Sequence, residues 1–121
     1  MMHVYGILTK NNTALFVKGH DNIWRLPSVH LKEKVEDIRT VVGSLKIGMK
    51  NFLHVDVEPA DIAYQHEENG SKHVFLKIKN FSGKLNEGVE TNWMEFDRMN
   101  KTSIDILPSH KNAVFMSTLK E

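Results

Sequence analysis

The chain has 121 residues, 40% of them hydrophobic, which is enough to bury the core of one domain without disulfides or structural metals. It contains no cysteine, so a disulfide framework, a thiolate metal site and a cysteine nucleophile are excluded. The 16 basic and 15 acidic residues give a net charge of +1, which provides no strong global attraction to nucleic acid or membrane.

The sequence also predicts where in the cell the protein acts. The first residues lack the basic start and uninterrupted apolar run of a signal peptide, and no apolar run reaches membrane-spanning length. We therefore expect a cytoplasmic protein with no membrane partner, and a cysteine-free chain fits that compartment.

The first third of the chain is typical of short strands joined by turns. Asn11-Asn12 tolerate the positive φ angles of a tight hairpin, and residues 19–22 predict a second turn. An extended segment follows from Ile23 to Leu26, and Pro27 ends it. The proline also biases Leu26 away from helical angles. The predicted strands are residues 3–9, 13–18 and 23–26.

The strongest periodic pattern predicts a helix over residues 31–52. Gly43 and Gly48 each cost about 1 kcal/mol relative to alanine inside a helix, so this helix must depend on packing. We expect a kink or an early end near Gly48. The residues of the apolar face are spaced alternately by four and three: Leu31, Val35, Ile38, Val42, Leu45, Met49 and Phe52.

The rest of the chain predicts further strands and a closing helix. Asn69-Gly70 marks a hairpin turn, residues 82–88 a loop, and Pro108 the start of a helix of about residues 109–119. With no internal repeat or linker, we expect one α/β domain over residues 1–121. The predicted strands are residues 55–57, 61–66, 73–78 and 93–96.

Three segments, in this order and spacing, resemble parts of a known family. Residues 4–8 with 14–17 look like its opening strands, Trp24-Arg-Leu-Pro27 like the approach to its signature, and residues 90–97 like its late strand containing Glu and Trp. The family is the Nudix hydrolases. The resemblance covers nearly the whole chain and implies an α/β/α sandwich with a mixed central sheet, acting on diphosphate linkages of nucleoside derivatives.

The chemical part of that signature is missing. In the family, a Gly-Gly pair after the Leu-Pro leads to a helix whose glutamates hold magnesium or manganese against a diphosphate. Here the pair is Ser28-Val29, and residues 43–51 carry no carboxylate. Hard divalent cations need several oxygen ligands, and activation of water needs the metal. Hydrolysis with Mg or Mn therefore requires a relocated metal site.

Several residues are candidates for binding a phosphorylated ligand. Lys32, Arg39, Lys46 and Lys50 share one side of the predicted helix and suit phosphate, although such rows are more often solvated surface. Two further candidates are His30 and Trp24. His30 follows the Leu-Pro turn and could contact a phosphate, although it could simply end a loop. Trp24 could stack on a base, although such an aromatic residue is more often part of the core.

Glutamates are the candidates for relocated chemistry. Glu33 and Glu36, with Asp37, fall in the first turns of the predicted helix, where acidic residues also stabilise the helix dipole. The other candidate glutamates fall in predicted loops, where a charged side chain more often serves only to keep the surface soluble. The weak catalytic candidates are Glu33, Glu36 and Glu90, and the weak metal candidates are Glu36, Glu67 and Glu68. Seven histidines show no i,i+4 pairing, which predicts no zinc site.

Two functions follow from the resemblance. The first is a divergent Nudix protein that binds a nucleotide or other phosphorylated small molecule and hydrolyses it only if the glutamates assemble a metal site. The second is a catalytically inactive Nudix-like module for ligand sensing or protein contact. A third reading is an accidental resemblance in another small α/β domain. The sequence leaves the oligomeric state open, a homodimer included.

Overall fold

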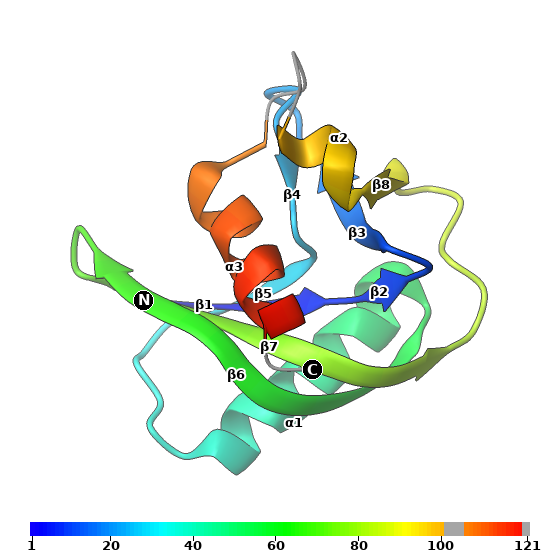
Figure 1. Cartoon of the computed structure of the whole chain (residues 1–121). Coiled ribbons are helices and arrows are strands. Elements are labelled where there is room, and N and C mark those ends of the chain that lie inside the picture. Colours follow the sequence, from blue (N-terminus) through cyan, green and yellow to red (C-terminus); the bar gives the residue numbers. More distant parts are fainter. Residues whose placement is uncertain (101–105, 120–121) are drawn as a thin grey trace.

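The computed structural model describes residues 1–100 and 106–119, in which a four-stranded sheet lies between two helices (Figure 1). The strand order is β5-β1-β7-β6. β1 pairs parallel with β7 and antiparallel with β5, and β7 pairs antiparallel with β6, so the sheet is mixed, as predicted. These strands are β1 (Met2–Ile7), β5 (Ser28–Leu31), β6 (Asp56–Glu68) and β7 (Ser71–Ser82).

A second, smaller sheet is built around β3, which pairs antiparallel with three other strands. Asn11 and Asn12, with φ of 50° and 62°, form the predicted hairpin turn, but only Thr9–Lys10 of the strand predicted at 3–9 pairs with β3, because Met2–Ile7 belongs to the other sheet. The predicted turn at residues 19–22 is closed by the Gly19 N–H, which donates to the Ile23 carbonyl. The strands are β2 (Thr9–Lys10), β3 (Thr13–Lys18), β4 (Trp24–Arg25) and β8 (Thr91–Glu95).

The helices are α1 (Ile38–Leu53), α2 (Phe96–Asn100) and α3 (Pro108–Leu119). α1 and α3 cover opposite faces of the four-stranded sheet (Figure 1). Successive strand residues point to opposite faces, so Val4 and Val74 pack toward α1 while Tyr5 and Phe75 pack toward α3. Among the described residues, no helix is long and apolar enough to cross a membrane.

Helix α1 begins at Ile38, so the prediction of a helix from Leu31 was wrong. Leu31 is the last residue of β5, and the Asp37 side chain caps the helix by accepting the Arg39 N–H at 3.0 Å. The apolar residues before Ile38 belong to a strand and a loop, but their spacing happens to match that of the helix. The expected face also differs, since the residues buried on α1 are Val41, Leu45, Met49 and Leu53.

The helix does not end at Gly48 but continues to Leu53. A Cβ at position 48 would lie 1.8 Å from Cγ1 of Val29, so this glycine allows α1 to approach β5 closely. The helix ends at His54, whose left-handed backbone lets its N–H donate to the Lys50 carbonyl.

The remaining predictions were confirmed in part. The two strands expected at 55–57 and 61–66 are one strand, β6, with irregular pairing around Pro59. Asn69 and Gly70, with φ of 52° and 80°, form the predicted turn into β7. The closing helix begins at Pro108, as expected, whereas β5 and α2 were not predicted.

Candidate functional site

Helix α1 lacks the ligands for a hard divalent cation. It carries no Asp or Glu from Ile38 to Leu53. Position 48, which faces β5, has no room for a side chain because Val29 occupies the space. Magnesium and manganese prefer several carboxylate or other oxygen ligands. The residues of this helix therefore do not fit the metal that the Nudix resemblance implies.

The basic candidates lie apart from the buried face of the helix. Arg39, Lys46 and Lys50 are exposed and line up about a third of a turn from the core-facing residues. Lys50 forms an ion pair with Asp56 at 3.2 Å. Lys32 precedes the helix, so the expected strip of four basic residues is a strip of three. The geometry of these side chains is that of a solvated face.

A pocket of about 290 Å³ lies beside β4, β5 and the C-terminal end of α1. The polar residues that line it are Arg25, Ser28 and His30, and Phe52 is an apolar residue of its lining. Arg25 donates two hydrogen bonds to Asp21, at 2.6 and 2.9 Å, and these hold the pKa of that carboxyl well below its usual range. A guanidinium, an imidazole and a hydroxyl in one small hollow suit a phosphate group.

Trp24 is not among the residues that line this pocket. It is half-buried, packs against the core on the α3 side, and has the Lys18 ammonium 5.8 Å from its ring centroid. Its backbone also bridges to Ile106. Trp24 thus joins β4 to the start of the C-terminal region.

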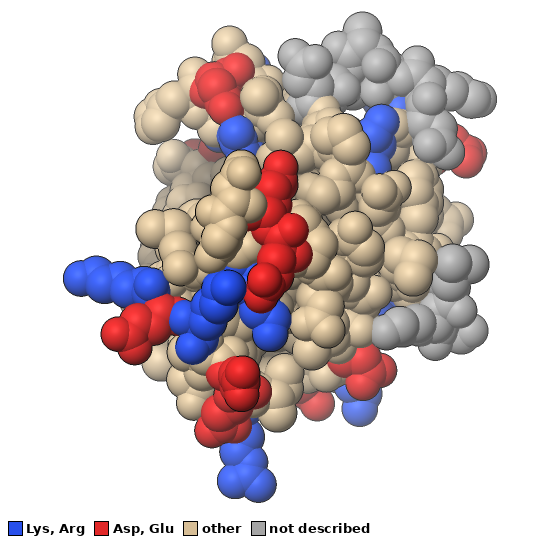
Figure 2. Space-filling view, turned by 90° about the vertical axis from the view of Figure 1, so that its left-hand side faces the viewer, with Lys and Arg blue, Asp and Glu red and all other residues tan. Residues whose placement is uncertain are grey.

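The glutamate candidates are spread over the surface. Glu33 and Glu36 are exposed in the segment before α1, so the expectation that they occupy its first turns was wrong. Glu67 pairs with Lys34 at 3.3 Å, and Glu90 pairs with Lys18 at 3.6 Å. The side of the molecule shown in Figure 2 carries interspersed acidic and basic side chains rather than one sign. Within the described residues these glutamates do not form a shared metal site.

Four histidines form a row across the whole four-stranded sheet, on the face toward α3. The strand register places His30 opposite His3, His3 opposite His73, and His73 opposite His66. The rings of His66 and His73 stack at 4.7 Å, those of His73 and His3 stack at 4.5 Å, and His3 meets His30 edge-on at 4.4 Å. Each of the four strands therefore contributes one imidazole, and neighbouring imidazoles are in contact.

The polar atoms of this row are only partly paired. The Tyr5 hydroxyl lies 2.8 Å from Nδ1 of His73, and burial raises the pKa of Tyr5 to about 12. Among the described residues, Nδ1 of His3 and Nδ1 of His66 are buried without a hydrogen-bond partner. Burial lowers the pKa of His3 and of His73, and neighbouring histidines lower both further. These two rings are therefore neutral at pH 7.

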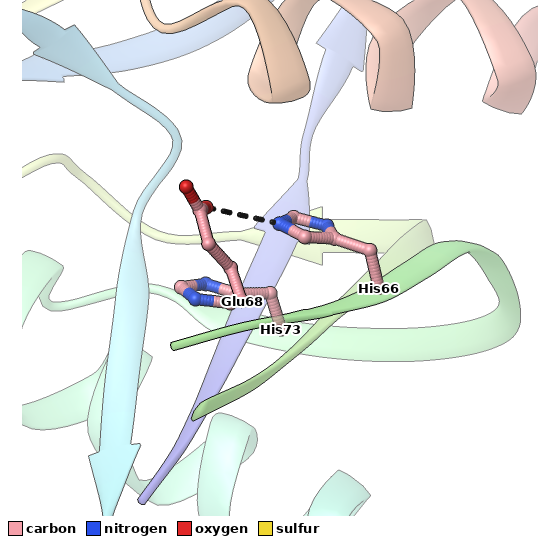
Figure 3. A group of neighbouring side chains, drawn as sticks. All are labelled: His66, Glu68 and His73. Atoms are coloured by element: carbon pink, nitrogen blue, oxygen red, sulfur yellow. Dashed lines mark ion pairs between the residues drawn. The ribbon is translucent and has the colours of Figure 1, made fainter. Parts of the chain in front are cut away.

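Glu68 completes a compact group at the β6–β7 turn (Figure 3). His66, Glu68 and His73 each offer one ligand atom, and these atoms lie within 4.8 Å of one another. Nε2 of His66 is 3.7 Å from a Glu68 oxygen. The i,i+4 spacing of zinc-binding histidines does not identify this group. The sequence feature that does identify it is the position of His66 and His73, which are equally far from Asn69-Gly70, so a two-residue hairpin turn pairs them.

His110, on α3, is a buried residue whose contacts are structural. It is 2% exposed, and its Nδ1 accepts the Leu26 N–H at 2.9 Å, which ties α3 to the strand before Pro27. Its ring meets Tyr5 and Phe75 edge-on. Burial lowers the pKa of His110 to about 3, so the ring is neutral and accepts through Nδ1.

A mixed sheet between α1 and α3, with the Trp-x-Leu-Pro segment leading into β5 and α1, defines a Nudix-like fold. The solved structures that resemble this chain agree. A MutT protein from work on Aliivibrio salmonicida and Vibrio cholerae has a TM-score of 0.76 at 12% identity, covering 99% of this chain and 98% of that one. The MutT Nudix hydrolase of Burkholderia pseudomallei has a TM-score of 0.69 at 17% identity, with 95% of each chain covered.

An ADP-ribose pyrophosphatase from Streptococcus suis has a TM-score of 0.66 at 11% identity, covering 99% of this chain and 92% of that one. No family model matches the sequence, and no curated protein is similar to it. At these identities the likeness shows the fold, which confirms the α/β/α sandwich predicted from the sequence.

Proposed function

We propose that this protein binds a nucleotide or another phosphorylated small molecule without hydrolysing it by the Nudix metal mechanism. The observation that carries the proposal is α1, which has no carboxylate and has Val29 in the space that a side chain at position 48 would need. One structural neighbour is named an ADP-ribose pyrophosphatase, and this name is our ground for choosing diphosphate ligands as the first class to test.

The pocket beside β4 and β5 is the proposed binding site. The Arg25 guanidinium has five N–H donors, and the pair with Asp21 leaves some of them for a phosphate oxygen. His30 is exposed and adds an N–H donor, while Phe52, 40% exposed, offers an apolar surface for the rest of the ligand. A volume of about 290 Å³ suits the phosphate end of a ligand rather than a whole dinucleotide.

We further propose that residues 1–121 act as one domain in the cytoplasm. The weak catalytic and metal candidates have no role in the proposed binding. Binding depends instead on fixed donors and on a pocket shape that exists without an ion. Affinity should then be independent of chelators.

A panel of nucleoside-diphosphate derivatives in EDTA tests the proposal by thermal stabilisation. We expect at least one ligand to raise the melting temperature, and His30→Ala to weaken its binding about tenfold, as loss of one hydrogen bond to a charged group predicts. Gln65→Ala, an exposed change on β6 of the same sheet, is the matched control and should leave binding unchanged.

Two results would contradict the proposal. One is the absence of stabilisation by every ligand in EDTA. The other is release of phosphate or nucleoside monophosphate that requires Mg²⁺ or Mn²⁺ and is absent in the chelator.

A further inference from the structure

We propose that His66, His73 and Glu68 bind one divalent transition-metal cation of borderline softness, for which Zn²⁺ is the test ion. The site lies at the β6–β7 turn, on residues other than those of the proposed phosphate pocket. It is independent of the proposed function, because neither the ligand atoms nor the expected ion are shared with that pocket.

The strand register brings the ligands together. His66 and His73 are directly paired across β6 and β7, and Glu68 lies two residues after His66 on the same strand. The three ligand atoms lie within 4.8 Å of one another. Zinc bonds of about 2.0–2.2 Å in a tetrahedral site place ligand atoms roughly 3.3 Å apart. Binding of the ion therefore requires the His66 ring, now stacked on His73, and the exposed Glu68 side chain to turn toward Nε2 of His73 (Figure 3).

Tyr5 fixes which nitrogen of His73 is free to bind. Its hydroxyl is within 2.8 Å of Nδ1, so the tautomer with hydrogen on Nδ1 donates to Tyr5 and presents the Nε2 lone pair. Metal-binding histidines commonly have their second ring nitrogen held in this way, which sets the ring orientation. Tyr5 is therefore a positioning residue for the proposed ion.

Packing alone is a poor explanation of this row. Two of its ring nitrogens, on His3 and His66, are buried without partners among the described residues, and a buried unpaired polar atom is destabilising. Apolar residues at these positions would fill the same sheet face without that loss. Neither unpaired atom is a proposed ligand atom, since His3 lies outside the group and His66 faces Glu68 through Nε2, so the case for the ion rests on the ligand geometry.

The donor set selects the kind of ion. Imidazole nitrogens suit zinc, copper, nickel and iron, whereas magnesium and calcium require oxygen ligands. Two histidines and one glutamate leave a coordination position open, as in catalytic zinc sites. The side chains of His66 and Glu68 are 22% and 67% exposed, so solvent reaches that position and the ion has a path to it.

The first experiment uses the unmodified full chain. Zn²⁺ is added to one equivalent, the protein is dialysed, and bound metal is measured, with imidazole ¹⁵N chemical shifts recorded in parallel. We expect about one retained equivalent, with shifts at His66 and His73 and none at His20, which is exposed in the turn before β4. No retained zinc, or zinc that leaves both rings unshifted, would overturn the proposal.

Variants then assign the ligands. His66→Gln, His73→Gln and Glu68→Gln should each weaken Zn²⁺ binding at least tenfold, and Tyr5→Phe should weaken it by a similar factor through the lost second contact of His73. His20→Ala is the matched control and should bind as the parent does. Far-ultraviolet circular dichroism confirms that each variant is folded. Equal affinity in all folded variants would show that the zinc is bound elsewhere and would refute the assignment.

Discussion

Gly48 is a residue at which α1 lies close against β5. The helix passes so close to β5 that a Cβ at this position would lie 1.8 Å from Val29. Gly43, on the same helix, has nothing within 4 Å of the corresponding position. The two glycines look alike in the sequence, but one is required by packing and the other is not.

Alanine at these two positions should therefore have opposite effects. Gly43→Ala should raise the free energy of unfolding by about 1 kcal/mol, because alanine is the better helix former. Gly48→Ala should lower it by roughly 1–3 kcal/mol, because the added methyl overpacks the contact with β5. Urea denaturation of both variants checks the prediction. Combining Gly48→Ala with Val29→Ala should recover part of the loss, and a Gly48→Ala variant more stable than the parent would disprove the contact.

His110 makes stability depend on pH. Its pKa is about 3 in the folded protein and about 6.5 when unfolded, so below pH 6.5 the unfolded chain binds a proton that the folded chain does not. The free energy of unfolding therefore falls as the pH drops from 6.5 toward 3. His3 and His73, whose pKa values are also lowered, act in the same direction.

The substitution His110→Phe removes this titrating group. At pH 7.5 the variant should be less stable by about 1–3 kcal/mol, because the Leu26 N–H loses its acceptor. At pH 5 the deficit should shrink by about 2 kcal/mol, since only the parent has lost the contribution of a neutral His110. Denaturant unfolding at the two pH values measures the difference. A deficit that stays constant would mean that His110 titrates normally in the folded state.

At the scale of elements, the β6–β7 hairpin depends on its two-residue turn. Gly70 has φ of +80°, which an L side chain rarely adopts, and the space around it is open. Gly70→Ala should therefore destabilise the protein by about 1 kcal/mol through backbone strain alone. Thermal or urea unfolding checks this, with Gly43→Ala as the control of opposite sign. The same loss should appear with and without Zn²⁺ if the strand register is kept.

The elements also show how far local pattern predicts structure. Turn chemistry predicted both hairpins, because Asn-Asn and Asn-Gly favour positive φ wherever they occur. Periodicity misplaced the start of α1, because two half-buried residues at helix-like spacing lie outside the helix: Leu31 in a strand and Val35 in a loop. Asp37, the capping side chain, was the local signal for the true start. β5 follows directly after Pro27, because the proline separates two extended segments rather than ending the extended region.

At the scale of the whole molecule, the order of segments predicted the fold, while the spatial pairing of the histidines was visible only in part. His66 and His73 were predictable from their shared turn. Their alignment with His3 and His30 depends on the parallel register of β1 with β7 and the antiparallel register with β5, which packing across the sheet sets. The absence of carboxylates on α1 was readable directly, but the Gly48–Val29 contact required the fold.

The most direct measurement of the central claim is calorimetric titration of a nucleoside-diphosphate derivative into the protein, once in EDTA and once in Mn²⁺, with the ligand analysed for products afterwards. We predict the same affinity in both buffers and an intact ligand, because binding in the pocket lined by Arg25, Ser28 and His30 is proposed to need no ion and α1 has no carboxylate to hold one. Binding that appears only with Mn²⁺, together with cleavage of the diphosphate, would contradict it.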